Sequence, residues 1–328
     1  MGSWLARSRL KNREANPRRN LKQSAEVEGL NPVVETIISR RRMGPLENNL
    51  KASIIIPTKD KISRLRLVLY ALALQINEDH EVIIVMDGCN QDTLTEFRKI
   101  ELPFQPVLVI LDHSGGRAAA RNHGIRKASG DILIFMDDDR IPGPHFIEGH
   151  IAVHQKKRCM VLGKRMQLFL TEEFITTLGH FGNLNQCLES VLLVAKPDVT
   201  WLKNKIYLLR FSPVPWLACV TSNLSVRKND MHETGMFDEN YAGWGWEDSD
   251  LGYRFLKNKI KMIKNASVIN YHLVHPKPKN LHQEEFNNYQ YFYTKAKGDH
   301  ITRFSLIIIR LIRDIGFLFQ KLMKRYQE

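Results

Sequence analysis

The chain has 328 residues, 43% of them hydrophobic and 25% charged, which is ordinary for a soluble globular enzyme and enough for a sizeable core. Its net charge of +13 is uneven, because residues 1–50 hold ten Lys and Arg against five Glu, and residues 301–328 hold six against two acids. A nucleic-acid enzyme would gather basic side chains around its groove, so this pattern argues against nucleic acid and favours an anionic membrane surface.

The four cysteines are scattered, without a C-x-x-C pair or the spacing of metal ligands, which is typical of a reduced, intracellular protein. No apolar run reaches the roughly 18 residues needed to cross a bilayer, and the N-terminus lacks the apolar region of a signal peptide. We therefore expect a cytoplasmic protein, with peripheral contact at the inner face of the cell membrane left open.

Residues 1–50 predict a flexible basic arm and a short helix, with a solvated tail of no specific role as the alternative. From Ala52 onward, short continuous apolar runs alternate with segments of helical spacing. Predicted strands are 53–57, 82–86, 107–111 and 131–136, and predicted helices are 64–74, 93–100 and 116–128. This alternation indicates an α/β fold with a Rossmann-like, mainly parallel sheet covered by helices on both faces.

Residues 145–215 mix short helices with irregular stretches and carry no usable motif. A strand-like run at 217–224 predicts the start of a second, smaller lobe. The sequence Gly-Trp-Gly-Trp-Glu-Asp at 243–248 follows it and leads into a predicted helix at 249–257.

The segment 306–325 predicts a basic amphipathic helix. At 100° per residue its charged side chains fall within a sector of about 120°, and the remaining face is Leu, Ile and Phe. Such a helix suits a membrane interface, and it would also suit a cap on the protein's own core or on a dimer partner.

Acidic residues follow two of the predicted strands: Asp87 ends the second, and Asp137-Asp138-Asp139 follow the fourth. The carboxyl ends of parallel strands form the ligand-binding edge of such a sheet, where Thr58 and Asp60 are also expected.

A hard cation such as Mn²⁺ or Mg²⁺ prefers oxygen ligands, and a nucleotide diphosphate supplies more of them. Residues two apart in a strand point to the same side, so Asp137 and Asp139 are expected to act together while Asp138 faces elsewhere. A solvated acidic turn is the structural alternative.

Four segments in this order resemble the nucleotide-binding half of glycosyltransferase family 2, which has the GT-A fold. They are 53–58, 85–88, 115–124 and 131–139. The block 244–248 resembles the acceptor region of β-1,4-galactosyltransferases and of bacterial chondroitin-type polymerases. The resemblance covers roughly residues 51–280 and implies four parts: a basic extension (1–50), a nucleotide-sugar-binding region (51–160), an acceptor-binding and catalytic region (161–300) and the C-terminal helix (301–328).

The resemblance also implies roles for single residues. Asp248 would be the catalytic base, Glu247 would bind sugar, and Trp244 and Trp246 would pack against acceptor rings. The metal ligands would be Asp137, Asp139 and His272, with His275 as the less favoured substitute. The donor-binding residues would be Pro57, Thr58, Asp60, Asp87 (accepting the N–H of a uracil ring), Arg117, Arg121, Asp137 and Asp138.

Several of these residues also have a purely structural explanation. The two arginines would lie on a solvated helix face, Glu247-Asp248 would cap a helix, and the tryptophans would pack in the core. The sequence also departs from the family pattern at Trp246, where relatives often have glycine, and in the loop 57–61, which lacks the usual Asn-Arg.

Together these features predict a metal-dependent, inverting transferase. It would move a hexose or N-acetylhexosamine from a UDP-sugar to a hydroxyl of a glycan, lipid-linked or peptide acceptor, with Mn²⁺ or Mg²⁺ as cofactor. A retaining transferase on the same fold and a non-catalytic nucleotide-sugar-binding subunit stay open. A dehydrogenase is disfavoured because no G-x-G-x-x-G follows the first strand.

Overall fold

The computed structural model describes residues 50–178, 191–198, 203, 207–209, 211–276 and 281–311, which lie within one compact unit, Asn48–Glu328. The predicted extension at 1–50, apart from Leu50, and the far end of the predicted C-terminal helix, 312–328, fall outside these residues.

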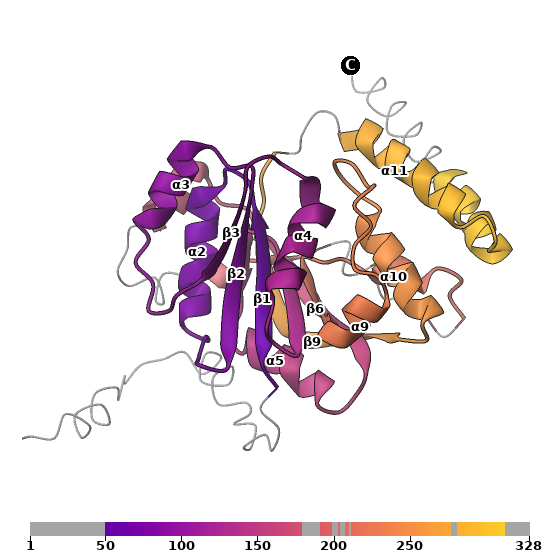
Figure 1. Cartoon of the computed structure of the whole chain (residues 1–328), viewed down its shortest axis with the longest axis horizontal. Helices are drawn as coiled ribbons and strands as arrows, with labels where there is room; N and C mark the ends of the chain where they lie inside the picture. Colours follow the sequence, from indigo (N-terminus) through magenta and orange to yellow (C-terminus); the bar gives the residue numbers. More distant parts are fainter. Residues whose placement is uncertain are drawn as a thin grey trace, which may run out of the picture. The chain divides into compact units, whose positions relative to one another are not determined.

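The described strands form one nine-stranded sheet in the order β3-β2-β1-β4-β8-β6-β9-β5, with β7 paired to β6. Its first half is parallel and alternates with helices (Figure 1). The elements of this half are β1 (Ala52–Thr58), α2 (Ile62–Ala73), β2 (His80–Asp87), α3 (Gln91–Arg98), β3 (Val107–Leu111), α4 (Gly116–Lys127) and β4 (Ile132–Met136). The elements predicted here from periodicity begin and end within two residues of the observed ones.

Alternation along β1 explains why helices cover both faces. Ile54 and Ile56 pack into one core with α2 and α5, whereas Ile55 packs into the other core with α4. Helix α4 lies close to the sheet because it is rich in small residues. A Cβ on Gly124 would stand 2.5 Å from the side chain of Ile55, so this position requires glycine.

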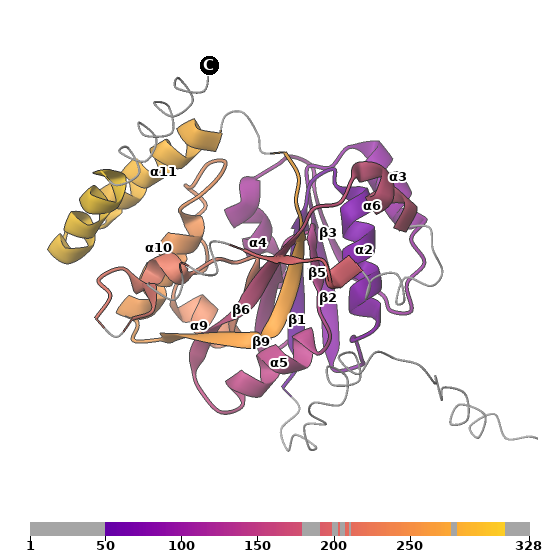
Figure 2. The ribbon, with the colours of Figure 1, turned by 180° about the vertical axis from the view of Figure 1, so that it is seen from behind.

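The second half of the sheet is mixed (Figure 2). Its elements are β5 (Arg140–Pro142), α5 (Phe146–His154), β6 (Cys159–Leu168), α6 (Glu172–Leu178), β7 (Lys196–Pro197), the 3₁₀ helix η1 (Pro215–Ala218), β8 (Asn223–Arg227), α9 (Lys228–Glu233), α10 (Glu247–Lys257), β9 (Lys261–Leu273), α11 (Leu281–Lys295) and a helix at 300–311.

The strand-like run predicted at 217–224 corresponds to η1 and the start of β8, and it does not begin a separate sheet. Strand β8 lies between β4 and β6, antiparallel to both. Leu224 and Val226 are fully buried and share one core with Phe135 of β4, which is why this strand joins the first half of the sheet. A single sheet thus supports both the segments predicted to bind the donor and those predicted to bind the acceptor.

A third, aromatic core joins α10, α11 and the helix at 300–311. Trp216, Trp246, Phe292 and Leu306 are buried in it. This core holds the segment 243–248 against the body of the protein.

Candidate active site

The carboxyl ends of β1, β2 and β4 lie side by side, as the parallel pairing requires. Thr58 ends β1, and its Oγ1 donates a 2.8 Å hydrogen bond to the carboxylate of Asp138, which lies just after β4. Both side chains are buried. The structure therefore brings two of the predicted donor-side residues into direct contact.

Asp137 faces a different partner from Asp138 and Asp139. The chain leaves β4 at Met136 and turns, and the N–H of Arg140 donates to the Asp137 carbonyl at 3.2 Å. Strand alternation ends there. Asp137 and Asp139 were predicted to act together, but in this structure they do not share a partner. Asp137 accepts from Arg121 at 3.1 Å, whereas Asp139 faces two histidines.

Among the described residues, Asp139, His272 and His275 form a group of side chains that could ligate a metal ion. Their ligand atoms all lie within 4.8 Å of one another. The Nε2 atoms of His272 and His275 lie 3.7 and 3.1 Å from the two carboxylate oxygens of Asp139. The ladder between β5 and β9 pairs Arg140 with His272, which sets Asp139 beside the end of β9.

The electrostatics of this cluster suit metal ligation. Burial, followed by the charge of Arg140, lowers the pKa of His272 to about 4, so its ring is neutral at pH 7. Burial would raise the pKa of Asp139, but the hydrogen bond from His275 and the charge of Lys61 outweigh it and hold that pKa well below its usual range.

The carboxylate is a ligand that suits Mn²⁺, and the two imidazoles are ligands that divalent transition-metal ions accept. Nδ1 of His275 lies 2.9 Å from the Pro276 carbonyl oxygen and its Nε2 lies 3.1 Å from Oδ2 of Asp139, so both ring nitrogens face oxygen atoms that hold the ring in place. The ammonium of Lys61 already supplies a cation 2.8 Å from Asp139. These residues fit a divalent cation, with His275 beside His272 rather than in place of it.

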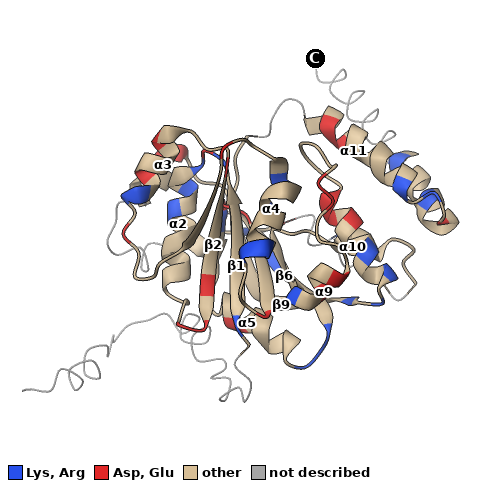
Figure 3. Cartoon of the chain, in the orientation of Figure 1, with Lys and Arg blue, Asp and Glu red and all other residues tan. Residues whose placement is uncertain are grey.

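Arg121 connects this edge of the sheet to the acceptor-side segment. Its side chain is 4% exposed, and its guanidinium lies 3.1 Å from Asp137, 3.3 Å from Glu247 and 3.8 Å from Asp248. Burial would lower the pKa of Arg121, but Asp248, Asp137 and Glu247 raise it above its ordinary value. Figure 3 shows the acidic start of α10 next to α4, which carries Arg121 and other basic residues.

Asp248 lies in the first turn of α10, where the positive end of the helix dipole favours carboxylates. The backbone N–H and the hydroxyl of Thr221 donate to its two oxygens at 3.0 and 2.7 Å. Its side chain keeps 21% of its surface exposed, whereas that of Glu247 keeps 6%. Asp248 is thus fixed in orientation and still reachable by an acceptor.

The two tryptophans of this segment differ in their surroundings. Trp244 is half-buried, whereas Trp246 is 8% exposed and packs against Tyr289 and Phe292 with ring centroids 5.3 and 5.7 Å away. Trp246 therefore lies in the aromatic core, as the alternative of core packing predicted. Its φ of 75° is the left-handed conformation that glycine adopts freely, so the tertiary packing sustains this strain.

Asn288 of α11 holds the backbone of the same segment. Its side-chain amide donates to the carbonyl oxygens of Ala242, Gly245 and Trp244, at 2.8, 3.0 and 3.3 Å. Gly243 and Gly245 have φ of 70° and 96°, so the segment depends on tertiary hydrogen bonds to stay in place.

Asn288→Ala should lower the rate of the predicted sugar transfer roughly tenfold without weakening nucleotide binding. Losing these hydrogen bonds should destabilise the ordered conformation of the segment that carries Asp248 by about 1–3 kcal/mol. Steady-state rates and calorimetry with UDP would measure this. Asn287→Ala, which changes an exposed neighbour, is the matched control. Equal rates for both variants would remove Asn288 from this role.

Asp87 and Asp60, which were also predicted to bind the donor, accept hydrogen bonds at the starts of two helices. Asp87 accepts from the Ser114 hydroxyl at 2.8 Å and from the backbone N–H of Gly115 and Gly116 at 2.7 and 3.2 Å, and so caps α4. Asp60 accepts from the N–H of Asn90 and the hydroxyl of Thr93 at the start of α3.

Pro57 lies half-buried within β1 beside Thr58, and Arg117 is exposed one helical turn before the buried Arg121. On the helix face that the two arginines were predicted to share, Arg117 lies in solvent and Arg121 lies beside the buried carboxylates.

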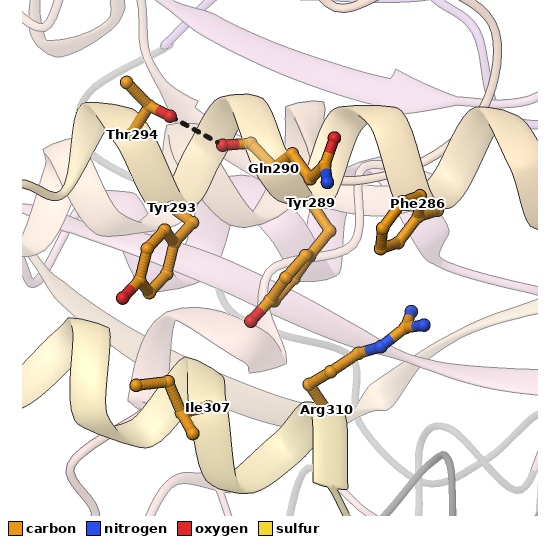
Figure 4. Close-up of a pocket in the computed structure, with 7 residues that line it drawn as sticks. All are labelled: Phe286, Tyr289, Gln290, Tyr293, Thr294, Ile307 and Arg310. Carbon is orange, nitrogen blue, oxygen red and sulfur yellow. Dashed lines mark hydrogen bonds between the residues drawn. The ribbon is translucent and has the colours of Figure 1, made fainter.

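A cavity of about 440 Å³ lies between α11 and the helix at 300–311 (Figure 4). It is lined by Phe286, Tyr289, Gln290, Tyr293, Thr294, Ile307 and Arg310. None of the predicted site residues contributes to this lining.

The described part of the C-terminal helix docks on α11. Leu306 is fully buried, and its carbonyl accepts from the Tyr289 hydroxyl at 3.3 Å. Ile301, Phe304 and Leu311 are more than half exposed. One side of this helix therefore packs on the protein's own core, which was one of the alternatives for this segment. Among the described residues, no helix is long and apolar enough to span a membrane.

The sequence reasoning missed Lys61, Thr221 and Asn288 and gave His275 second rank. Lys61 lies on the loop already singled out after β1, which was an available signal. Thr221 and Asn288 belong to no motif, and only the tertiary structure brings them to the site.

Two family models match the chain. Residues 53–184 match "Glycosyl transferase family 2", and residues 211–276 match "N-terminal domain of galactosyltransferase". The second match contains Thr221, Asp248, His272 and His275, and the first contains the three adjacent aspartates.

Curated relatives are similar at low identity. A Bacillus subtilis protein named "Uncharacterized glycosyltransferase YfnE" is 26% identical over 69% of this chain and 66% of its own length. Validoxylamine A glucosyltransferase of Streptomyces hygroscopicus is 29% identical over 64% of this chain and 52% of its own length. Hyaluronan synthase of Pasteurella multocida is 26% identical over 74% of this chain but only 26% of its own length. The chain thus spans two thirds or less of these relatives.

Two solved structures share the fold. GalNAc-T7, solved with UDP, GalNAc and Mn²⁺, aligns with a TM-score of 0.53 at 14% identity, over 75% of this chain and 48% of that one. The mannosyltransferase PcManGT of Pyrobaculum calidifontis, solved with GDP-Man and Mn²⁺, aligns with a TM-score of 0.51 at 15% identity, over 81% and 70%.

Proposed function

We propose, from the premise that this chain belongs to glycosyltransferase family 2 and carries a galactosyltransferase-like C-terminal region, that it is an inverting, metal-dependent transferase that uses a UDP-sugar. The transferred group is a hexose or N-acetylhexosamine, and the acceptor is a hydroxyl of a glycan, a lipid-linked precursor or a peptide. The observation that carries the proposal is the convergence of Asp139, His272 and His275 beside the Arg121 network that reaches Asp248.

The cation site is the first part of the mechanism. Asp139, His272 and His275 would hold the divalent cation, which neutralises the charge that grows on the leaving diphosphate. Arg117 is exposed on the same helix as Arg121 and is the second cation available to a phosphate. Asp87 and Thr58 line the nucleotide side of this edge, and Asp87 would accept the uracil N–H beside its contacts to α4.

Proton transfer is the second part. One carboxylate oxygen of Asp248 would take the proton of the acceptor hydroxyl while the hydroxyl oxygen attacks the anomeric carbon, and UDP would leave on the opposite face. Thr221 fixes the direction of this carboxylate. Glu247, held by Arg121, would accept hydrogen bonds from sugar hydroxyls, and Trp244 offers a half-buried ring against which an acceptor would pack.

The test is to offer the purified protein a panel of UDP-sugars with Mn²⁺ and to measure UDP release with and without simple acceptors. We expect release with one or a few donors, and NMR of the product should find the anomeric configuration inverted. Binding of UDP-sugars without any turnover would instead indicate a non-catalytic subunit, and a retained configuration would refute the assignment of Asp248 as the base of a single displacement.

A further inference from the structure

The ammonium of Lys61 lies inside the cluster that would hold the metal. Its Nζ is 2.8 Å from Oδ2 of Asp139, 3.4 Å from Oδ1 of Asp138 and 3.5 Å from Nε2 of His275. Lys61 precedes α2 on the loop that follows β1, so it reaches the centre from a different segment than the other groups.

These contacts involve the same atoms that a metal would use. The Oδ2 of Asp139 and the Nε2 of His275 are only 3.1 Å apart, and both face Lys61. In this structure the ammonium of Lys61 therefore lies against the carboxylate oxygen and the ring nitrogen that a bound metal would contact.

The buried carboxylates explain why a cation is needed when no metal is bound. The side chains of Asp138 and Asp139 are each 6% exposed, and adjacent carboxylates in such a place destabilise each other. The side chain itself is one-third exposed, so it has a route out of the cluster.

We propose that Lys61 is a displaceable counter-cation: it occupies the centre when no metal is bound, leaves when the divalent cation binds, and then pairs with the diphosphate of the donor. The last step rests on the proposed function. This arrangement makes binding of the metal and of the nucleotide mutually reinforcing, because the metal releases the positive charge that the diphosphate then uses.

Replacing Lys61 tests the exchange directly. Mn²⁺ is titrated into the full-length protein without nucleotide, with free Mn²⁺ followed by EPR, for the wild type, Lys61→Met and Lys59→Met. Lys59 is an exposed neighbour with the same charge, so its variant is the matched control. We expect Lys61→Met to bind Mn²⁺ about tenfold more tightly, corresponding to about 1.4 kcal/mol, and to bind UDP several-fold more weakly once Mn²⁺ is saturating.

The wild type offers a second readout that does not depend on the variant folding. An amine-acylating reagent, followed by mass spectrometry, reports how accessible each lysine is. Acylation of Lys61 should rise several-fold on addition of Mn²⁺ and fall again on addition of UDP, while Lys59 stays unchanged.

The possible results distinguish a failure of the exchange at Lys61 from a failure of the metal site itself. If the wild type binds Mn²⁺ but Lys61 acylation does not respond and Lys61→Met has unchanged Mn²⁺ affinity, the counter-cation proposal is overturned while the metal site stands. If the wild type binds no Mn²⁺ and UDP binding ignores EDTA, Lys61 holds the centre permanently, and both the exchange and the metal dependence fail.

Discussion

Asp248→Asn should abolish sugar transfer, with a loss of at least about 10³-fold, while leaving UDP affinity within roughly twofold of the wild type. The amide has nearly the shape of the carboxylate, so the Thr221 N–H at 3.0 Å keeps an oxygen acceptor. The amide cannot take a proton from an attacking hydroxyl. The measurement is the transfer rate with the best UDP-sugar of the panel, together with calorimetry of UDP in the presence of Mn²⁺.

The control for this prediction is Ser249→Ala, which changes the next residue of α10, for which we assign no role in the site. It should retain near-normal transfer. A second comparison, Glu247→Gln, should raise the KM for a sugar substrate more than it lowers kcat, since Glu247 is assigned to binding. Near-normal turnover by Asp248→Asn would remove Asp248 from the role of base.

The first half of the fold could be predicted from the sequence because its signals are local. Continuous apolar runs such as Ile54–Ile56 form the buried parallel strands, and their carboxyl ends put Thr58 next to Asp138 as the topology of such sheets requires. The placement of β8 could not be predicted in this way. Its insertion between β4 and β6 depends on antiparallel pairing between residues about ninety positions apart.

Within the site, the prediction was limited by where the strand ends. Alternation along β4 would have put Asp137 and Asp139 on one side, but the turn after Met136 sends them to Arg121 and to the histidines. The turn is stabilised by a backbone hydrogen bond that strand periodicity does not encode. His275 was ranked second because the family resemblance points to His272, and because His275 lies two residues beyond the end of β9, where strand alternation no longer sets the side-chain direction.

The tryptophans illustrate a second limit. Trp244 and Trp246 look equivalent in sequence, yet only Trp246 fits between Tyr289 and Phe292 of α11. A helix more than forty residues away in the chain decides which ring is buried. The same helix supplies Asn288, whose hydrogen bonds to the segment 242–245 no local pattern would reveal.

Metal-dependent binding of UDP tests the central claim, that Asp139 and the two histidines hold a divalent cation that binds the nucleotide's diphosphate. Asp139 contributes the carboxylate of the cluster, so Asp139→Ala leaves only two imidazoles and should lose the cation. Its effect should be far larger than that of Asp92→Ala, a change of an exposed carboxylate at the start of α3. Thermal melting of both variants controls for folding.

The decisive measurement is calorimetry of UDP binding to the wild type and to Asp139→Ala, each with and without Mn²⁺. The wild type should bind UDP at least about tenfold more tightly with Mn²⁺, and the folded Asp139→Ala variant should lose that gain. A UDP affinity that is the same in all four experiments would contradict the claim that this cluster holds the metal for a sugar nucleotide.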